Sequence, residues 1–439
     1  MHYLNVDNLL KLLFLLMPLS FIIGPAAINF NIFLLFINYL LIIFLKKNIE
    51  YSDIYKDKLF LFFWVFFFYL ILLSLISSDI LFSLKSSLSF IKFLFIYLAF
   101  KYLLSNNILS FKLTIIVFVL VIIFVVIDSS FQIISGSNLF FIERKYGQYS
   151  GVFGEEHILG SYLSRTLFLF SIFLIIFKSK NKIIYSIFLL LLLGIFMGIL
   201  FSGERTAVLN LFLFCSFSII FKIIRINLIS FIAIISILIF GCLFIINNNY
   251  LYDRYVQTNI DQFNKFENLS IPLPDHYYLH YLTALKIFKD NPIVGIGPNM
   301  FRKYCNKDNY FSKAGDFQEI PETIPHVSGK ITKEEVELNA KIGRLNTLDG
   351  CSTHPHHMHL QILTELGVIG YIFFVLFFTY IILNFFINKP INNVDKFLLI
   401  GILINIFPFL PSGNFFGSYF NFLAFLPILF FLNRKYFLY

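Results

Sequence analysis

The sequence has few charged residues, a single tryptophan and only four cysteines among its 439 residues. Charged residues make up 13% of the chain and hydrophobic residues 58%, which leaves too little polar surface for a soluble domain. Four cysteines are too few for a disulfide scaffold. The first apolar run lacks a small-residue cleavage site and is followed by another apolar run, so we do not expect a cleavable signal peptide. The composition indicates an integral membrane protein.

Apolar runs of the length that crosses a bilayer recur along the chain. A spanning helix needs about 20 apolar residues, and on that basis we predict an all-α polytopic membrane protein with about 12 transmembrane helices. Eleven remain possible, because several runs are short or interrupted by Gly or Pro. The predicted helices cover residues 9–24, 28–45, 59–76, 86–104, 112–134, 158–177, 183–201, 205–221, 228–246, 359–387, 395–411 and 415–433.

The positive charge of the chain follows these helices. The net charge is +9, and Lys and Arg gather in the short loops on one side of the predicted helices. Membrane proteins keep that side in the cytoplasm, so the charge indicates topology rather than nucleic-acid binding. We therefore predict a bacterial inner-membrane protein with both termini cytoplasmic. Residues 1–246 hold helices one to nine, residues 247–358 form a large periplasmic loop with a surface helix and a histidine segment, and residues 359–439 hold helices ten to twelve.

The large loop differs in composition from the rest of the chain. It carries 13 of the 25 acidic residues and, counted to His359, 7 of the 9 histidines. Residues 276–290 have apolar side chains at helical spacing, which predicts an amphipathic helix at the membrane surface. The polar stretch 326–350 predicts a mobile or short-helical insertion. Cys305 and Cys351 flank that insertion in an oxidising compartment, so we predict a disulfide, with two free thiols as the alternative.

Ionisable side chains within spanning helices are costly and are therefore candidates for function. On the twelve-helix topology five of them fall in the outer third of their helices, which predicts a polar cavity open to the periplasm; they are Lys92, Asp128, Arg165, Arg205 and Glu365. The alternative is that they reach the nearby headgroups. Arg205 lies in the tight turn Ser-Gly-Glu-Arg-Thr at 202–206, where backbone N–H groups and a guanidinium suit a phosphate.

A histidine segment, Cys-Ser-Thr-His-Pro-His-His-Met-His at 351–359, leads directly into an apolar helix. A metal site is one interpretation, but Pro355 breaks the run and no His-Glu-x-x-His pattern is present, so we predict neither a metal nor a cofactor. Some of these histidines, His357 or His359 first, are expected to cap the helix or lie at the interface. The functional interpretation is general acid–base catalysis, because imidazole titrates near neutral pH.

Two glycine-bearing segments accompany the histidines. Gly367 and Gly370 follow Glu365 and are expected to let another segment approach the helix closely. Asn-Pro-Ile-Val-Gly-Ile-Gly-Pro-Asn at 291–299 superficially resembles a dinucleotide fingerprint. No strand–turn–helix unit surrounds it, so we predict a rigid turn packed beside the histidine segment.

These motifs together resemble the O-antigen ligase/polymerase family. The resemblance rests on four segments: DNPIVGIGPNMF at 290–301, CSTHPHHMHLQILTELGVIG at 351–370, SGERTA at 202–207 and GVFGEEHILGSYLSR at 151–165. It covers about residues 140–430, and twelve helices with a large loop between the ninth and tenth are similar to the family arrangement. Each motif alone is weak, whereas the combination is specific.

The resemblance implies transfer of a glycan from an undecaprenyl-diphosphate carrier to an acceptor hydroxyl in the periplasm, without a metal. The acceptor would be the lipid A core for a ligase, a lipid-linked repeat for a polymerase, or a protein Ser in related enzymes. A flippase for lipid-linked oligosaccharide and a scaffold of an export complex are the alternatives. The sequence does not name the sugar, the linkage or the oligomeric state.

The family pattern assigns roles to particular residues. The catalytic candidates are His356, Arg205 and Glu365; the candidates for binding the diphosphate or glycan are Arg165, Arg302, His354, His280, Gly295 and Gly297. The sequence departs from the pattern at two histidines, because His357 replaces an Asn and His359 an aromatic residue. A family Arg near the start of the 276–290 helix is also missing, with Tyr277 and His280 nearby. Arg302 or Arg254 could supply that charge.

Overall fold

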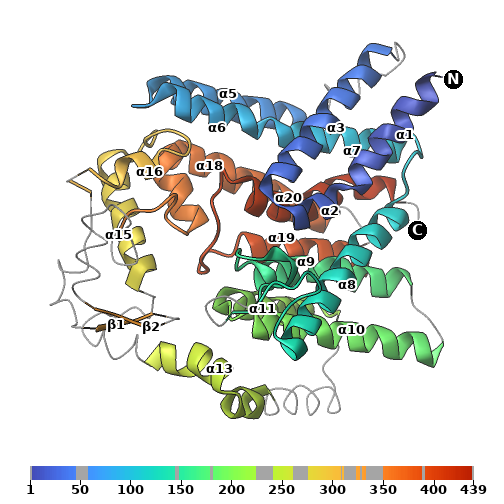
Figure 1. Cartoon of the computed structure of the whole chain (residues 1–439). Coiled ribbons are helices and arrows are strands. Elements are labelled where there is room, and N and C mark those ends of the chain that lie inside the picture. Colours follow the sequence, from blue (N-terminus) through green and yellow to red (C-terminus); the bar gives the residue numbers. More distant parts are fainter. Residues whose placement is uncertain are drawn as a thin grey trace.

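The computed structural model describes residues 2–45, 58–143, 148–177, 181–223, 241–260, 275–307, 309–310, 323–326, 329–332, 350–387 and 391–437. Helices dominate these residues (Figure 1). The α-helices are α1 (His2–Leu15), α2 (Met17–Ile23), α3 (Pro25–Leu45), α5 (Lys58–Ile76), α6 (Ile80–Phe90), α7 (Lys92–Ser105), α8 (Phe111–Ser135), α9 (Leu159–Ile176), α10 (Lys182–Phe201), α11 (Arg205–Ile220), α13 (Asn249–Tyr252), α15 (Asp275–Asp290), α16 (Phe301–Tyr304), α18 (Met358–Ile387), α19 (Asn393–Asn405) and α20 (Ser418–Asn433). Shorter turns are η1 (Gly151–Phe153), η2 (Asp253–Gln257) and η4 (Arg434–Tyr436).

Seven helices in the described part of the chain are long and apolar enough to cross a membrane. An eighth span results if α1 and α2, which are bent by 46° relative to each other, count as one. The helical, multi-pass class is thus confirmed, whereas the count of twelve stays a prediction. The expected helix at 228–246 lies largely outside the described residues, and α11 is a shorter apolar helix.

Two expected spans are interrupted in the structure. The run predicted at 9–24 is divided between α1 and α2, and Pro18 lies in the first turn of α2, where its missing N–H group costs no helical hydrogen bond. The run predicted at 86–104 is part of a longer span, 80–105, in which α6 gives way to α7 at Ile91. This break places Lys92 at the start of α7.

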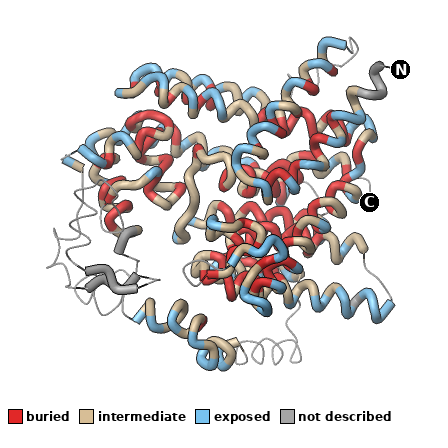
Figure 2. Tube along the Cα trace, in the orientation of Figure 1, coloured by how far each residue is buried: buried red, intermediate tan, exposed pale blue. Residues whose placement is uncertain are grey.

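The buried core of the helical bundle surrounds α9. This helix packs against α8, α10, α11 and α19, and 72% of its apolar window is buried. The corresponding share is only 22% for α5 and α18 and 18% for α10. Figure 2 shows the same gradient, with buried residues concentrated around α9, α19 and α20. The outer helices expose large apolar side chains, as expected for surfaces that face lipid.

Local signals fix several helix boundaries. The Ser110 side chain accepts a hydrogen bond from the Leu113 N–H and begins α8, while Gly136 at φ 87° ends it in the left-handed conformation. Asn392 and Asp395 form a reciprocal capping box at the start of α19. These caps position the ends of the helices that surround α9.

The large loop contributes α13, η2, α15, α16 and one hairpin. The surface helix predicted at 276–290 is present as α15. Strands β1 (Thr323–His326) and β2 (Gly329–Thr332) pair antiparallel, with Ile324 opposite Ile331. The expected mobile or helical insertion at 326–350 therefore begins as a strand, because the chain turns back on itself there, and residues 333–349 lie outside the described part. The hairpin is the exception to the all-α class.

Candidate active site at the histidine segment

Two of the four histidines in the segment hold the start of α18 in place. Nδ1 of His357 accepts a hydrogen bond from the Leu360 N–H at 3.2 Å, and Nε2 lies 2.9 Å from the Pro408 carbonyl oxygen. His357 therefore acts as an N-cap and, in that tautomer, donates to Pro408. The ring of His359 lies 2.9 Å from the Ile406 carbonyl oxygen and 3.1 Å from the Tyr371 hydroxyl. The expectation of a helix cap is confirmed for His357, whereas a position at the membrane interface stays a prediction.

His356 occupies an uncommon backbone conformation. Its φ is 54°, in the left-handed region, and its carbonyl oxygen accepts a hydrogen bond from the Ser412 N–H at 2.9 Å. Its half-buried ring meets three other rings: the centroid of His354 lies at 4.1 Å, and those of His280 and Tyr277 lie at 5.3 Å. The turn thus directs His356 towards α15, which supplies His280 and Tyr277. A non-glycine residue with positive φ is a pointer to function.

His354 is buried behind His356. Its Nδ1 lies 2.9 Å from the Thr353 hydroxyl, and its backbone is tied to the Ser352 hydroxyl. The pKa of His354 is lowered to about 4, chiefly by burial; the charges of Arg302 and His280 act in the same direction, and a backbone contact with Ser412 opposes them. His354 is therefore neutral at physiological pH and supports the ring of His356 without adding charge.

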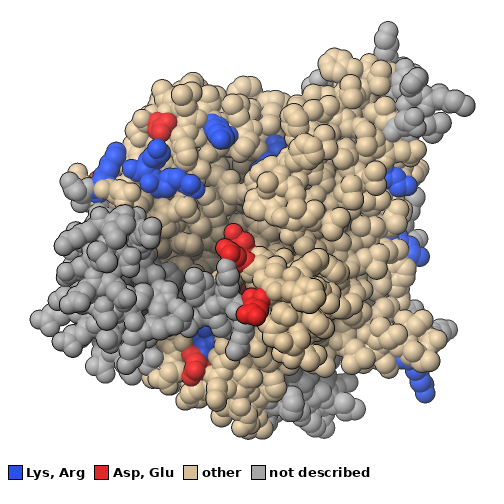
Figure 3. Space-filling view, in the orientation of Figure 1, with Lys and Arg blue, Asp and Glu red and all other residues tan. Residues whose placement is uncertain are grey.

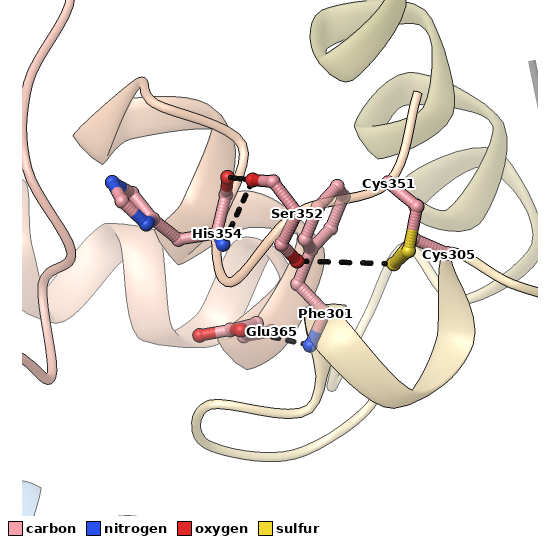
Figure 4. The surroundings of a disulfide bond; sticks show 6 residues. All are labelled: Phe301, Cys305, Cys351, Ser352, His354 and Glu365. Atoms are coloured by element: carbon pink, nitrogen blue, oxygen red, sulfur yellow. Dashed lines mark hydrogen bonds between the residues drawn. A yellow bond between two sulfur atoms is a disulfide. The ribbon is translucent and has the colours of Figure 1, made fainter. Parts of the chain in front are cut away.

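A disulfide joins Cys305, which follows α16, to Cys351 at the start of the segment, with Cα atoms 5.0 Å apart. Figure 4 shows the bridge on one side of the segment and the His354 ring directed away from it. The bridge ties the histidine segment to the C-terminal end of α16, although 46 positions separate the two cysteines.

Glu365 anchors the glycine-rich turn to α18. Its fully buried carboxylate accepts hydrogen bonds from the Asn299 N–H at 3.1 Å, the Phe301 N–H at 2.9 Å and the Gln361 side chain at 3.0 Å. Its carbonyl oxygen accepts from the Gly297 N–H at 2.9 Å. Its recorded partners are thus backbone amides and an amide side chain, an arrangement that positions the 290–301 segment.

Glycines permit this close approach. Gly295 and Gly367 have φ of 72° and 66°, and a Cβ atom on Gly295 would lie 2.5 Å from the backbone of Glu365. A Cβ atom on Gly367 would lie 2.2 Å from the Ile293 carbonyl oxygen. The rigid turn beside the histidine segment and the close approach at Gly367 are confirmed. The atoms nearest to Gly370 belong to Leu366 of its own helix.

Gly297 and Gly295, both expected to bind substrate, pack against protein in this structure. A Cβ atom on Gly297 (φ 103°) would lie 2.7 Å from the Ser77 side chain, at the junction of α5 and α6. Their substrate contacts remain a prediction, because the turn also needs both residues for its own packing.

The turn that carries Arg205 is anchored in the same way. The Glu204 carboxylate accepts hydrogen bonds from the Gly160 N–H at 2.6 Å and the Ser161 N–H at 3.0 Å, and so caps the start of α9. On the other side of the turn, Nε of Arg254 donates to the Gly203 carbonyl oxygen at 2.8 Å. Arg254 therefore lies beside Arg205.

Arg205 is connected to the histidines through Tyr277. Its Nη1 donates to the Asn259 side chain at 2.7 Å, and its charge interacts with Arg254 and Tyr277. Burial raises the pKa of the Tyr277 hydroxyl, and the charges of Arg205 and Arg254 act in the opposite direction. Since Tyr277 also contacts the His356 ring, the two guanidiniums lie on the α15 side of His356. Of the two arginines considered for the missing family charge, Arg254 is the one next to Arg205.

The other two predicted arginines lie in different surroundings. Arg165 is 5% exposed within the bundle, where it donates to Asn405 at 2.5 Å and to Ser161 at 3.2 Å. Arg302 donates to Asn299 at 3.4 Å, and its charge acts on His354. Figure 3 shows Lys and Arg gathered on the part of the surface over α6 and α16. Arg302 therefore lies beside the histidines, while Arg165 is held in the bundle by protein partners.

Metal-ligating side chains are not grouped in the described part of the chain, where no set of three His, Cys, Asp or Glu residues could hold an ion. The structure thus brings together His354, His356, His280 and Tyr277, with Arg205 and Arg254 on one side and Arg302 on another. Sequence reasoning gave no role to Glu204. Its only signal was its place between Gly203 and Arg205 in the turn.

Comparison with known proteins gives one match. Residues 188–375 match the family model described as O-Antigen ligase, so the resemblance to the O-antigen ligase/polymerase family is confirmed for this segment. The match includes Arg205, α15, the glycine-rich turn and the histidine segment, but not residues 151–165. Comparisons with curated proteins and with solved structures found no match. With the apolar helices, the match indicates a multi-pass bacterial membrane protein and an enzyme that acts on lipid-linked glycans.

Proposed function

We propose, from the family membership of residues 188–375, that this protein transfers a glycan from an undecaprenyl-diphosphate carrier to an acceptor hydroxyl on the periplasmic side of the inner membrane. The observation that carries the proposal is the position of His356. A half-buried imidazole, held in a left-handed turn, contacts Tyr277, and the charges of Arg205 and Arg254 act on the hydroxyl of that tyrosine. A proton acceptor beside paired cations suits a reaction that removes a proton and releases a diphosphate.

The reaction is a single displacement. The acceptor oxygen attacks the anomeric carbon of the donor sugar, a new C–O bond forms, and the bond from that carbon to the diphosphate oxygen breaks. The proton of the acceptor hydroxyl passes to a ring nitrogen of His356, and the diphosphate leaves with the electron pair. Attack from the face opposite the diphosphate inverts the configuration at the anomeric carbon.

The arginines on the α15 side stabilise the negative charge of the departing diphosphate. Guanidinium groups bind phosphate oxygens with two parallel hydrogen bonds, and Arg205 and Arg254 lie close enough to repel each other. A bound diphosphate relieves that repulsion. The buried, neutral His354 and the stacked His280 hold the His356 ring, and Glu365 acts as a positioning residue through the glycine-rich turn.

The transfer is tested in liposomes that contain the purified protein and an undecaprenyl-diphosphate-linked oligosaccharide, with and without lipid A core. The products are separated on a glycan gel. A ladder of repeats shows polymerisation, and one shifted band that depends on the core shows ligation. A transporter would move lipid without a change in glycan length. No longer product with a matched donor and correctly folded protein contradicts the proposal.

A further inference from the structure

An apolar groove of about 160 Å³ lies between α5, α7, α18 and α20. Its lining residues recur at helical spacing on each helix. On α20 they run from Asn421 through Phe425 and Ile428 to Leu432, and eleven residues of α-helix rise about 17 Å. The groove therefore extends over more than half of a hydrocarbon core about 30 Å thick.

The groove begins at the histidine segment. Met358, two residues after His356, is among its lining residues, as is Phe415 from the loop before α20. On the predicted topology both lie towards the periplasm, whereas Leu59 and Leu432 at the other end lie towards the cytoplasm. A chain in the groove would thus descend from the candidate active site into the membrane.

A cation marks the flank of the groove near that end. The Lys92 ammonium donates to the Ser418 hydroxyl at 3.0 Å and lies 5.4 Å from the ring of Phe93, a lining residue. Ser418 in turn donates to Asn29 at 2.9 Å. Within the described residues no carboxylate pairs with Lys92. A half-buried cation without a counter-charge favours an anionic headgroup.

The size of the groove limits what it holds. An engineered cavity of about 150 Å³ accommodates a molecule such as benzene, so a groove of similar volume takes part of one hydrocarbon chain at a time. Two acyl chains side by side would need more room. The occupant favoured by the groove and Lys92 together is a single-chain lipid with an anionic head.

The groove and the paired arginines lie on different sides of His356. Arg205 and Arg254 approach through Tyr277 of α15, whereas Met358 leads to α5, α7 and α20. In Figure 1, α11 and α13 lie well apart from α5, α6 and α7. If the donor diphosphate binds at the arginines, as the proposed function requires, the groove is left for a second lipid.

We infer that the acceptor is itself a polyprenyl-phosphate-linked glycan, whose chain lies in this groove with its phosphate at Lys92. This inference rests on the proposed function and assigns its acceptor. The product would be a longer glycan that is still attached to a lipid, which corresponds to polymerisation rather than transfer to lipid A core.

Lipid stoichiometry tests the inference separately from transfer. Undecaprenyl phosphate is titrated into the full-length protein in detergent and followed by native mass spectrometry. We expect two bound lipids for the wild type. Lys92→Gln should weaken the binding of one of the two lipids about tenfold, as expected for a lost hydrogen bond to a charged group. Ala424→Trp should fill the groove and abolish the binding of that lipid. Arg205→Gln should affect only the other lipid.

Matched variants provide the controls. Lys85→Gln removes an exposed lysine of α6, and Val375→Trp adds an indole to an exposed position of α18, and both should bind two lipids. A single bound lipid weakened by both Arg205→Gln and Ala424→Trp would assign the groove to the donor and overturn the inference. Displacement of the groove lipid by equimolar phosphatidylglycerol would also overturn it.

Transfer assays separate the two proposals. With a lipid-linked acceptor, Lys92→Gln should raise KM about tenfold at unchanged kcat, and with the same repeat lacking its lipid it should match the wild type. Equal KM values with the lipid-linked acceptor would contradict this inference alone. Two bound lipids without any glycan transfer would contradict the proposed function, and with it the identity of the second lipid as acceptor.

Discussion

Two turns on opposite sides of the histidine segment are built around the same device, a glutamate whose carboxylate accepts two backbone N–H groups from a segment distant in sequence. The Glu204 carboxylate accepts hydrogen bonds from the N–H groups of Gly160 and Ser161. The Glu365 carboxylate accepts them from Asn299 and Phe301. An arginine accompanies each turn, although at positions that are not equivalent. Arg205 follows Glu204, and Arg302 follows Phe301.

The two turns differ in burial and in charge. Glu365 is fully buried and also receives the Gln361 side chain, whereas Glu204 is half-buried beside the charges of Arg165 and Arg254. The Glu204 turn thus presents a pair of cations and the Glu365 turn a single one. We infer that the first turn is suited to a diphosphate and that the second mainly supports the histidines.

The largest expected effect is at His356, whose ring lies between the two turns. His356→Ala should lower glycan transfer about 10³-fold, within the range for loss of a general base, and leave the melting temperature unchanged. The measurement is the initial rate in liposomes. The matched control is His357→Asn, because Asn can also cap α18, and this variant should remain active. Full transfer by His356→Ala would remove that residue from the mechanism.

The next effect compares the two arginines. Arg205→Gln should reduce transfer about a hundredfold and Arg302→Gln about tenfold, since hydrogen bonds to charged groups contribute roughly 1.5–3 kcal/mol and only Arg205 belongs to the paired cations. Arg205→Lys should recover only part of the rate, because a single ammonium cannot form the bidentate contact. Equal losses for the two Gln variants would show that the turns do not differ in function.

A smaller effect concerns the glutamates themselves. Glu365→Gln turns an amide donor towards a backbone N–H and should cost about 2 kcal/mol of stability. Glu204→Gln should cost about 1 kcal/mol, because the Glu204 side chain is only half-buried. Thermal unfolding in detergent, monitored by intrinsic fluorescence, measures both. The test compares the losses of stability of the two variants. A larger loss for Glu204→Gln than for Glu365→Gln would contradict the proposed difference.

The smallest effect is a pH dependence at His354. Its pKa is lowered to about 4 in the folded protein, so below pH 6.5 the unfolded chain binds a proton that the folded chain does not. Stability should therefore fall as the pH decreases from 6.5 towards 4, by about 1 kcal/mol between pH 7.5 and 5.5. His354→Gln should remove that part of the pH dependence. If the melting temperature of His354→Gln still falls with pH as it does in the wild type, another group is responsible for the pH dependence.

Much of the arrangement was accessible from the sequence because it depends on local patterns. Helical spacing predicted α15, and apolar length predicted most of the helices. Gly295 and Gly297 indicated a rigid turn, and Gly367 and Gly370 indicated a close approach, which the structure shows at Gly367. Glu365 was a catalytic candidate from the family pattern. The structure adds that its carboxylate accepts hydrogen bonds from Gln361 and from two backbone amides that lie 64 and 66 positions away, and that the charge of Arg302 acts on it.

The sequence by itself determined a membrane-embedded helical protein, its family motifs and the identity of the histidine segment, because these follow from composition and from residues close together in the chain. Only the tertiary structure decided that the His359 ring lies against the Ile406 carbonyl oxygen, that Arg165 is committed to Asn405, and that Arg254 lies beside Arg205. The physical reason is distance along the chain: Arg254 reaches the carbonyl of Gly203 across 51 positions, and Arg165 reaches Asn405 across 240. Such contacts form only when separate helices pack.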